Sequence, residues 1–156
     1  MSSLFDNRQE TNLRACEQMV EAVLVSRGLD ANRHRIESHG GPAWGMTAGS
    51  AEIFIFLTAG SSGDNFIQVV APVMTPTEEH LAGPRLFRRL LELNAGELTG
   101  AAFGLRGNEV VITTDRSTQG LDPVEVEEMI RRVSDYADQY DDALTLEFGG
   151  TRHADT

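Results

Sequence analysis

The chain has 156 residues, a length that suits one domain with a real apolar core. Thirteen basic and 24 acidic residues leave a formal net charge of -11, so the protein repels DNA, RNA and anionic lipid surfaces. We therefore expect neither a nucleic-acid nor a membrane partner. All thirteen basic residues are arginines, which excludes mechanisms that need a lysine amine, such as a Schiff base or a phosphate-loop lysine.

The sequence predicts neither a membrane span nor a signal peptide. The longest apolar run, IFIFL, is far too short to cross a bilayer, and the stretch MSSLFDNRQE has no hydrophobic segment after a basic start. The single cysteine, Cys16, cannot form an internal disulfide, which agrees with a reducing compartment. We expect a cytoplasmic protein.

The first predicted helix covers residues 10–27 and follows a flexible stretch, residues 1–9. Its apolar residues recur at steps of three and four and form one stripe, made of Leu13, Cys16, Met19, Val20, Val23 and Leu24. Gly28 ends the helix. Because Cys16 lies on the stripe, we expect a buried structural thiol. Residues 29–41 are polar and turn-prone and form a connector.

Three strands are predicted next, beginning at Ala43, Ala51 and Asn65. The short links between them indicate an antiparallel meander. The run IFIFL does not alternate apolar with polar residues, which predicts that both faces of the middle strand are covered. Helices can cover one face, and a partner subunit is one candidate for the other.

A second helix is predicted to begin at Pro84, after a short turn near Pro76, and to end at Asn94 and Gly96. A hairpin around Gly107 follows it. The last helix has the clearest start, because Asp122 can cap it, Pro123 fits its first turn and Glu125 occupies the reciprocal capping position. We expect residues 10–150 to form a single domain and residues 151–156 to be a disordered tail.

The sequence contains few residues that could form a catalytic, metal-binding or cofactor-binding site. The histidines at positions 34, 39, 80 and 153 lie in predicted loops or the tail, and none shares a helix face with another ligand, so we predict no metal site. The glycine-rich stretches GGPAWG and AGSSGD match no phosphate or dinucleotide fingerprint and are interpreted as turns. No serine lies in a nucleophile-elbow pattern. The sequence therefore predicts no catalytic residue and no cofactor.

Four acidic residues crowd the predicted end of the last helix: Asp135, Asp138, Asp141 and Asp142. The helix dipole disfavours negative charge there. Two interpretations remain open. The group is either a solvated, fraying helix end, or an acidic patch that attracts a basic segment of a partner.

The segment LFRRLLELNAGELTGAAFGLRGNEVVITT, followed by GLDPVEVEEMIRRVSDYADQYDDAL, resembles the YbjN family of bacterial proteins. The likeness rests on the LLELN helix end, the GAAFGL strand, the hydrophobic strand after it, the LDP start of the final helix and its ADQYDD ending. That family is similar in fold to type III secretion chaperones. The resemblance implies an α+β domain with an antiparallel sheet of about five strands, in the order helix, three strands, helix, two strands, helix. It also implies a frequently dimeric protein that binds polypeptides or acts as a regulator, without catalytic residues.

Our preferred hypothesis is a non-enzymatic protein-binding domain, chaperone-like or regulatory and homodimeric. The candidate partner-binding residues lie on the second and third strands: Ile53, Phe54, Ile55, Phe56, Leu57, Phe66, Ile67 and Val69. The alternative at those positions is an ordinary core. The competing hypothesis is a small-molecule binder or enzyme with a cleft near Trp44, His80 and Arg85. The sequence does not separate a chaperone from a signalling or transcriptional regulator.

Overall fold

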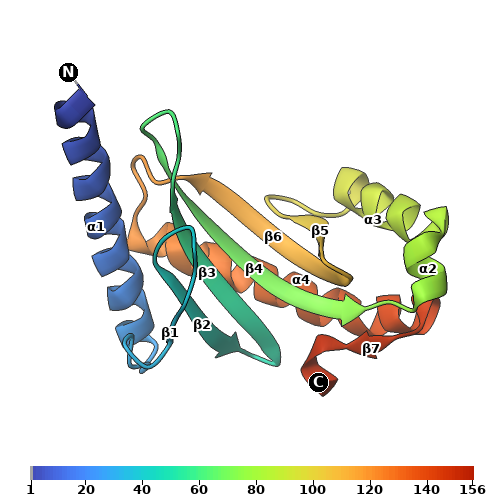
Figure 1. Ribbon diagram of the computed structural model, residues 1–156. Coiled ribbons are helices and arrows are strands. Elements are labelled where there is room, and N and C mark those ends of the chain that lie inside the picture. The colour runs from blue at the N-terminus through green and yellow to red at the C-terminus, as the bar shows by residue number, and fades with distance from the viewer. Residues whose placement is uncertain (1) are drawn as a thin grey trace. The chain divides into compact units, whose positions relative to one another are not determined.

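The computed structural model describes residues 2–156 and is drawn in Figure 1. The helices of this range are α1 (Ser2–Ser26), α2 (Glu78–Ala82), α3 (Pro84–Gly96), α4 (Pro123–Phe148) and the 3-10 turn η1 (His153–Asp155). Its strands are β1 (Arg35–Ile36), β2 (Ala43–Ala48), β3 (Ala51–Ala59), β4 (Asn65–Thr75), β5 (Ala102–Arg106), β6 (Glu109–Ser117) and β7 (Thr151–Arg152). None of these helices combines the length and the apolar character that a bilayer span needs.

The predicted fold class is confirmed, since the chain is α+β with an antiparallel sheet. The strands are ordered β1-β2-β3-β4-β6-β5, and β7 pairs with β4 outside this order. The three strands of the predicted meander begin at the expected residues, Ala43, Ala51 and Asn65. The sheet has seven strands within residues 2–156 rather than about five, because the two-residue strands β1 and β7 carry no apolar pattern that could reveal them.

The residues group into two compact units, which we describe separately. Unit 1 contains the chain up to Met46, Phe54–Val69 and Asp115–Met129, and unit 2 contains Thr47–Ile53, Val70–Thr114 and Ile130–Thr156. The expected single domain over residues 10–150 stays a prediction.

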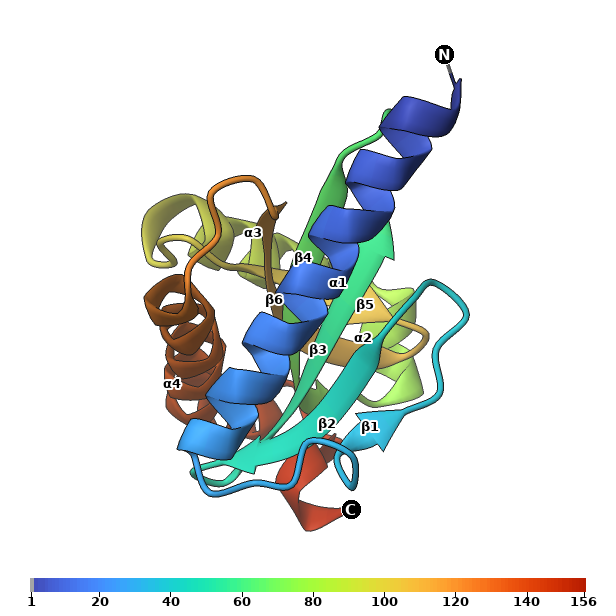
Figure 2. The same cartoon turned by 90° about the vertical axis from the view of Figure 1, so that its left-hand side faces the viewer.

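In unit 1, α1 begins at Ser2 and not at Glu10, so the expected flexible stretch is helical over residues 2–9. The apolar stripe marks only the part of the helix that packs, whereas polar residues without glycine or proline extend it. A side-chain bond holds this extension, since the Gln9 Nε2 donates to the Gly60 carbonyl over 2.8 Å. Two views show α1 beside β3 (Figures 1 and 2).

The predicted stripe of α1 forms part of the core of unit 1. Cys16, Val20, Val23 and Leu24 are buried, while Leu13 and Met19 are not fully covered. Burial raises the pKa of the Cys16 thiol, and a hydrogen bond with Thr118 opposes this rise. The predicted structural thiol is therefore confirmed as a buried one.

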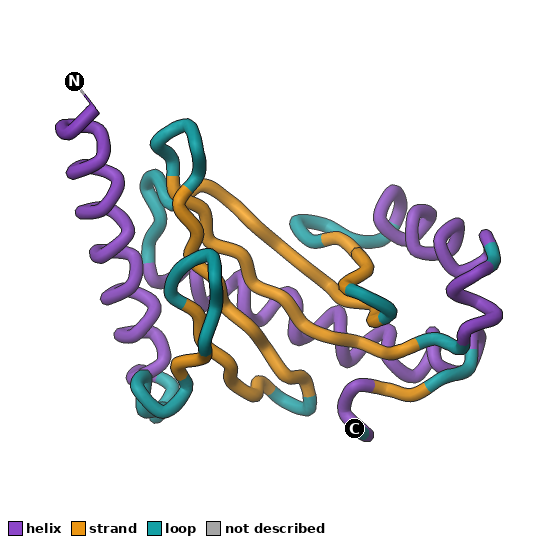
Figure 3. Tube along the Cα trace, in the orientation of Figure 1, coloured by secondary structure: helices purple, strands orange, loops and turns teal. Residues whose placement is uncertain are grey.

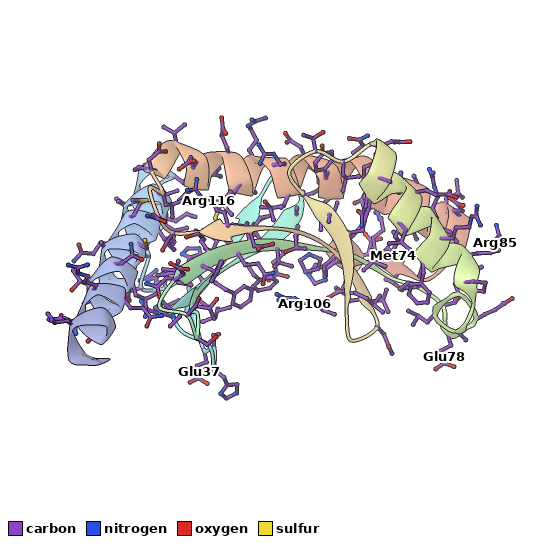
Figure 4. All side chains as sticks on the ribbon, turned by 90° about the horizontal axis from the view of Figure 1, so that it is seen from above. Glu37, Met74, Glu78, Arg85, Arg106 and Arg116 are labelled. Carbon is purple, nitrogen blue, oxygen red and sulfur yellow. The ribbon has the colours of Figure 1, made fainter. Side chains whose placement is uncertain are left out.

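The start of α4, also in unit 1, has the predicted reciprocal cap. The Asp122 N–H donates to a Glu125 carboxylate oxygen over 3.0 Å, and the Glu125 N–H donates to the Asp122 Oδ1 over 2.8 Å. Arg116 makes an ion pair with Glu125, and Figure 4 shows it beside the first turn of α4. The local sequence thus determines where this helix begins.

In unit 2, α3 packs against β5, and β5 forms a hairpin with β6 that is closed by Gly107 in the left-handed region, φ +57°. Figure 3 shows this arrangement of α3 with the two strands. The helix ends at Gly96, within the expected NAG stretch, and closes with the Glu97 N–H on the Leu93 carbonyl. Asn94 binds β5.

The end of unit 2 differs most from the prediction. The helix α4 runs to Phe148 because its apolar stripe continues beyond Tyr140 through Leu144 and Phe148, which are both buried. Residues 151–156, expected to be a disordered tail, form β7 and η1. Hydrogen bonding to β4 and ion pairs order this segment, and neither is visible in a polar sequence.

Candidate functional site

The candidate partner-binding residues of β3 lie on two different faces of the strand. Ile53, Ile55 and Leu57 are at most 1% exposed, whereas the alternate residues Phe54 and Phe56 are half-buried. Successive side chains of a strand point to opposite faces, which explains the alternation. Within this chain the phenylalanine face of IFIFL keeps accessible surface, and its cover by a partner subunit stays a prediction.

The same division occurs on β4. Ile67 and Val69 are buried, and Phe66 is 37% exposed. The five aliphatic candidates on the two strands are core residues, since a fully buried side chain has no surface left for a partner. The candidate surface is thereby reduced to Phe54, Phe56 and Phe66, which we call the aromatic patch.

The two rings of the patch on β3 lie 6.5 Å apart, centroid to centroid, with their planes tilted by 27°. Glycines border the patch: a Cβ atom on Gly45 would lie 3.4 Å from the Phe54 ring, and one on Gly60 would lie 3.0 Å from the Phe66 ring. The absence of side chains at these two positions leaves the ring faces uncrowded. The result is a shallow apolar surface on a rigid pair of strands.

A polar network fixes the strand that carries Phe66. The Asn65 Nδ2 donates to the Gln9 carbonyl and to the Asn12 Oδ1, each over 2.8 Å, and the Thr118 hydroxyl donates to the same Asn12 oxygen over 2.6 Å. A polar hollow of about 450 Å³ lies beside these bonds. Since Asn65 is 3% exposed, its bonds to α1 hold the start of β4 in place.

The residues of the alternative cleft do not form one in either unit. In unit 1 the Trp44 side chain is fully buried, and the Arg35 guanidinium lies over its ring at 5.1 Å while pairing with Glu17 over 2.6 Å. In unit 2 the His80 ring packs edge-on against Phe148 at 5.2 Å. Figure 4 shows Arg85 on α3 pointing away from the protein. Because Trp44 is inaccessible, it cannot contact a ligand as the cleft hypothesis requires.

The four acidic residues lie within α4 and not at its end, since the helix continues to Phe148. Three of them have partners in unit 2. Asp138 accepts from the Ser50 hydroxyl over 2.5 Å, Asp142 pairs with Arg152 over 2.6 Å, and Asp135 lies 3.5 Å from Arg131. Burial raises the pKa of the fourth, Asp141. The fraying-end interpretation is wrong, and an acidic surface that binds a basic partner stays a prediction.

The sequence reasoning missed His153, which lies between two carboxylates of unit 2. Its Nδ1 is 2.7 Å from a Glu109 oxygen and its Nε2 is 2.6 Å from a Glu52 oxygen. Burial alone lowers the pKa of His153, but the hydrogen bonds to Glu52 and Glu109 outweigh it and raise the pKa above its ordinary value. No spacing signal could have found this cluster, since its members are 44 and 101 positions apart. Among residues 2–156 no group of His, Cys, Asp and Glu is arranged to hold a metal ion.

The fold is that of a small α+β domain with an antiparallel sheet. The chain belongs to the TY-Chap1 family, described as T3SS (YopN, CesT) and YbjN peptide-binding chaperone 1, whose model matches residues 15–156. The resemblance to YbjN proteins is thus confirmed, and the family assignment supports a protein-binding, chaperone-like role. No curated protein matches the sequence.

Three solved structures with a similar fold are structures of complexes. A chain of the ExsC–ExsE complex matches with a TM-score of 0.62 at 14% identity, covering 84% of this chain and 94% of that one. A chain of the HopA1–SchA chaperone–effector complex matches with 0.59 at 9% identity, covering 85% and 97%. A chain of the ExoT–SpcS complex from Pseudomonas aeruginosa matches with 0.51 at 9% identity, covering 79% and 94%. At these identities the likeness shows the fold alone.

Proposed function

We propose that the protein is a non-enzymatic, cytoplasmic chaperone-like protein that binds an extended segment of a partner protein on its aromatic patch. The observation that carries the proposal is the aromatic face of the two strands, where Phe66 is 37% exposed and Phe54 and Phe56 are half-buried, opposite a fully buried aliphatic face. The family description and the chaperone–effector complex among the similar folds support it.

The spacing of the patch fits an extended ligand. Side chains on one face of a strand repeat about every 6.6 Å, and the Phe54 and Phe56 rings are 6.5 Å apart. A bound segment with apolar residues at alternate positions therefore places one on each ring. Because the rings are already ordered on the sheet, little conformational entropy is lost on the protein's side of the complex.

The proposal includes a homodimer, formed through α3 and β5 of unit 2. Phe87 and Leu91 are 36% and 67% exposed, and their spacing of four places them on one face of α3. On the neighbouring strand, Leu105 is 42% exposed. A protein with a net charge of -11 repels its own copies, so self-association needs apolar contact of this kind.

A site-specific crosslink tests the binding role. Replacing Phe56 by the photoreactive benzoylphenylalanine in the native cells should yield adducts with partner proteins, mapped by mass spectrometry to segments with alternating apolar residues. The matched control carries the same group at Leu146 of α4, which is 89% exposed. A Phe66→Ser change in the same chain should reduce adducts at position 56. Equal adducts at both positions, unaffected by Phe66→Ser, contradict a specific patch.

Light scattering after size-exclusion chromatography tests the homodimer. The unmodified protein should elute with twice the chain mass, and Leu91→Arg should elute as a monomer because the charge lies within the apolar contact. A wild-type protein that stays monomeric at high concentration contradicts the homodimer. Peptide binding would then still be tested by the crosslinking experiment.

A further inference from the structure

Residues 151–156 bind to unit 2 as an added strand. After Phe148 the chain turns through Gly149 and Gly150, whose φ angles are +63° and +89°. Thr151 and Arg152 then pair antiparallel with Thr75 and Met74 of β4, as Figure 1 shows for β7 beside the end of β4. The turn depends on glycine, since a Cβ atom on Gly150 would lie 2.0 Å from the Thr75 carbonyl oxygen. The strand β7 can therefore pair with β4 only when residue 150 is glycine.

Two consecutive basic residues anchor the strand to carboxylates from three elements. Arg152 pairs with Asp142 of α4 over 2.6 Å. His153 bonds to Glu52 of β3 and to Glu109 of β6. Asp138 and Asp141 of α4 line the same small hollow as His153, together with Glu52. The receptor side of this contact is thus the end of β4, which five carboxylates border.

The contact between residues 151–156 and β4 is weak enough for another segment to replace residues 151–156. Thr151 and Ala154–Thr156 are exposed, and Arg152 and His153 are only half-buried, so the segment buries no large apolar side chain. Ion pairs at the surface contribute little to stability, because water and salt screen them. A two-residue ladder with such pairs opens far more easily than a packed core. Release exposes unpaired backbone groups on β4, which are a template for another strand.

We propose that residues 151–156 are a self-bound strand that occupies a docking site for an extended basic segment of a partner protein. The site consists of the β4 edge at Met74 and Thr75 and of the carboxylates Glu52, Glu109 and Asp142. The ligand is an extended segment with a basic pair equivalent to Arg152 and His153. This inference rests on the proposed function and adds a second class of segment, bound by residues other than those of the aromatic patch.

A glycine substitution in the full chain opens the site. Gly150→Ala places a Cβ atom against the Thr75 carbonyl, and the matched control is Gly63→Ala, which has nearly the same φ of +91° and nothing within 4 Å of the added atom. Hydrogen exchange measured by mass spectrometry should show lost protection in residues 70–76 and 149–156 of Gly150→Ala only. The double variant Arg152→Ala with His153→Ala is the second test, since it removes the anchors and leaves the turn unchanged.

The probe is a fluorescent peptide with the sequence of residues 149–156, GGTRHADT, measured by anisotropy. A tethered segment competes at an effective concentration in the millimolar range, so the opened variants should bind the peptide about tenfold or more tightly than the wild type and Gly63→Ala. A peptide with alanine at both basic positions should bind about fivefold or more weakly than GGTRHADT.

The outcomes separate the two proposals. Equal binding of GGTRHADT by wild-type and opened variants, no binding by any of them, or no effect of the basic pair overturns the docking site and leaves the crosslink at position 56 unaffected. If position 56 gives no adducts while the opened variants still bind GGTRHADT, the aromatic-patch function is contradicted and the docking site is not.

Discussion

Asn94 of α3 binds both backbone polar groups of Phe103 on β5. The Phe103 N–H donates to the Asn94 Oδ1 over 2.7 Å, and the Asn94 Nδ2 donates to the Phe103 carbonyl over 3.2 Å. Since β5 is the last strand in the sheet order, these groups have no strand on that side to pair with. The side-chain amide takes the place of a neighbouring strand and fixes α3 against the edge.

Asn94→Ala should lower the free energy of unfolding by about 1–3 kcal/mol, because it leaves both Phe103 groups without their partner. Urea denaturation followed by circular dichroism measures the change. Asn108→Ala, at the exposed hairpin turn, is the control and should change stability by less than about 0.5 kcal/mol. Equal effects of the two changes would mean that the amide contributes nothing to edge protection.

Asp122→Ala should destabilise the protein by about 1 kcal/mol, since it removes the acceptor for the Glu125 N–H at the start of α4. Asp122→Asn keeps an acceptor oxygen and should cost less. The exposed Asp115, also in unit 1, provides the control change to alanine. Thermal unfolding of the four proteins measures the differences, and an unaltered midpoint in Asp122→Ala contradicts the capping role.

Elements whose signals are local could be predicted from the sequence. The start of α4 follows from Asp122, Pro123 and Glu125 because a cap is made within four residues. The starts of β2, β3 and β4 follow from apolar runs bounded by turn residues. The predicted boundaries were wrong at residues 2–9 of α1, which extend the helix beyond its packed stripe, and beyond Tyr140 in α4, where Leu144 and Phe148 continue the apolar stripe.

The candidate site could be predicted only in part, because its faces depend on tertiary structure. In IFIFL every residue is apolar, so composition does not separate the buried Ile55 from the accessible Phe54. Strand alternation does separate them once the inward face is known. The contacts of His153 join residues 44 and 101 positions apart, and a single sequence carries no signal for such pairs. Asn94 and Phe103 are only nine positions apart, but their contact depends on how α3 packs against β5.

The two faces of the candidate strands should respond differently to truncation. Ile55→Ala should cost about 2–5 kcal/mol because it leaves a cavity in the core. Phe66→Ser, at a side chain that is 37% exposed, should cost less than half as much. Binding of a captured partner segment, normalised to folded protein, should be reduced by Phe66→Ser and unchanged by Ile55→Ala. The reverse order of binding effects would place the ligand elsewhere.

His153 should make the protein more stable at mildly acidic than at alkaline pH. Bonds from both ring nitrogens to carboxylates require the imidazolium form, and the folded pKa is raised above the ordinary value of 6.5. The stabilisation is therefore full below about pH 6.5 and is lost as the pH rises through the folded pKa.

The measurement is the free energy of unfolding of wild type minus that of His153→Ala, at about pH 6 and about pH 8.5. Taking the difference removes the contribution of Asp141, whose pKa is also raised. The stability difference between wild type and His153→Ala should be larger at the lower pH. Glu52→Gln should reduce this difference because it removes one of the two negative charges that face the imidazolium. An NMR titration of the His153 ring should give a pKa above 6.5. A titration at or below this value, with no pH dependence in the difference, would show that the two carboxylates do not hold a charged ring.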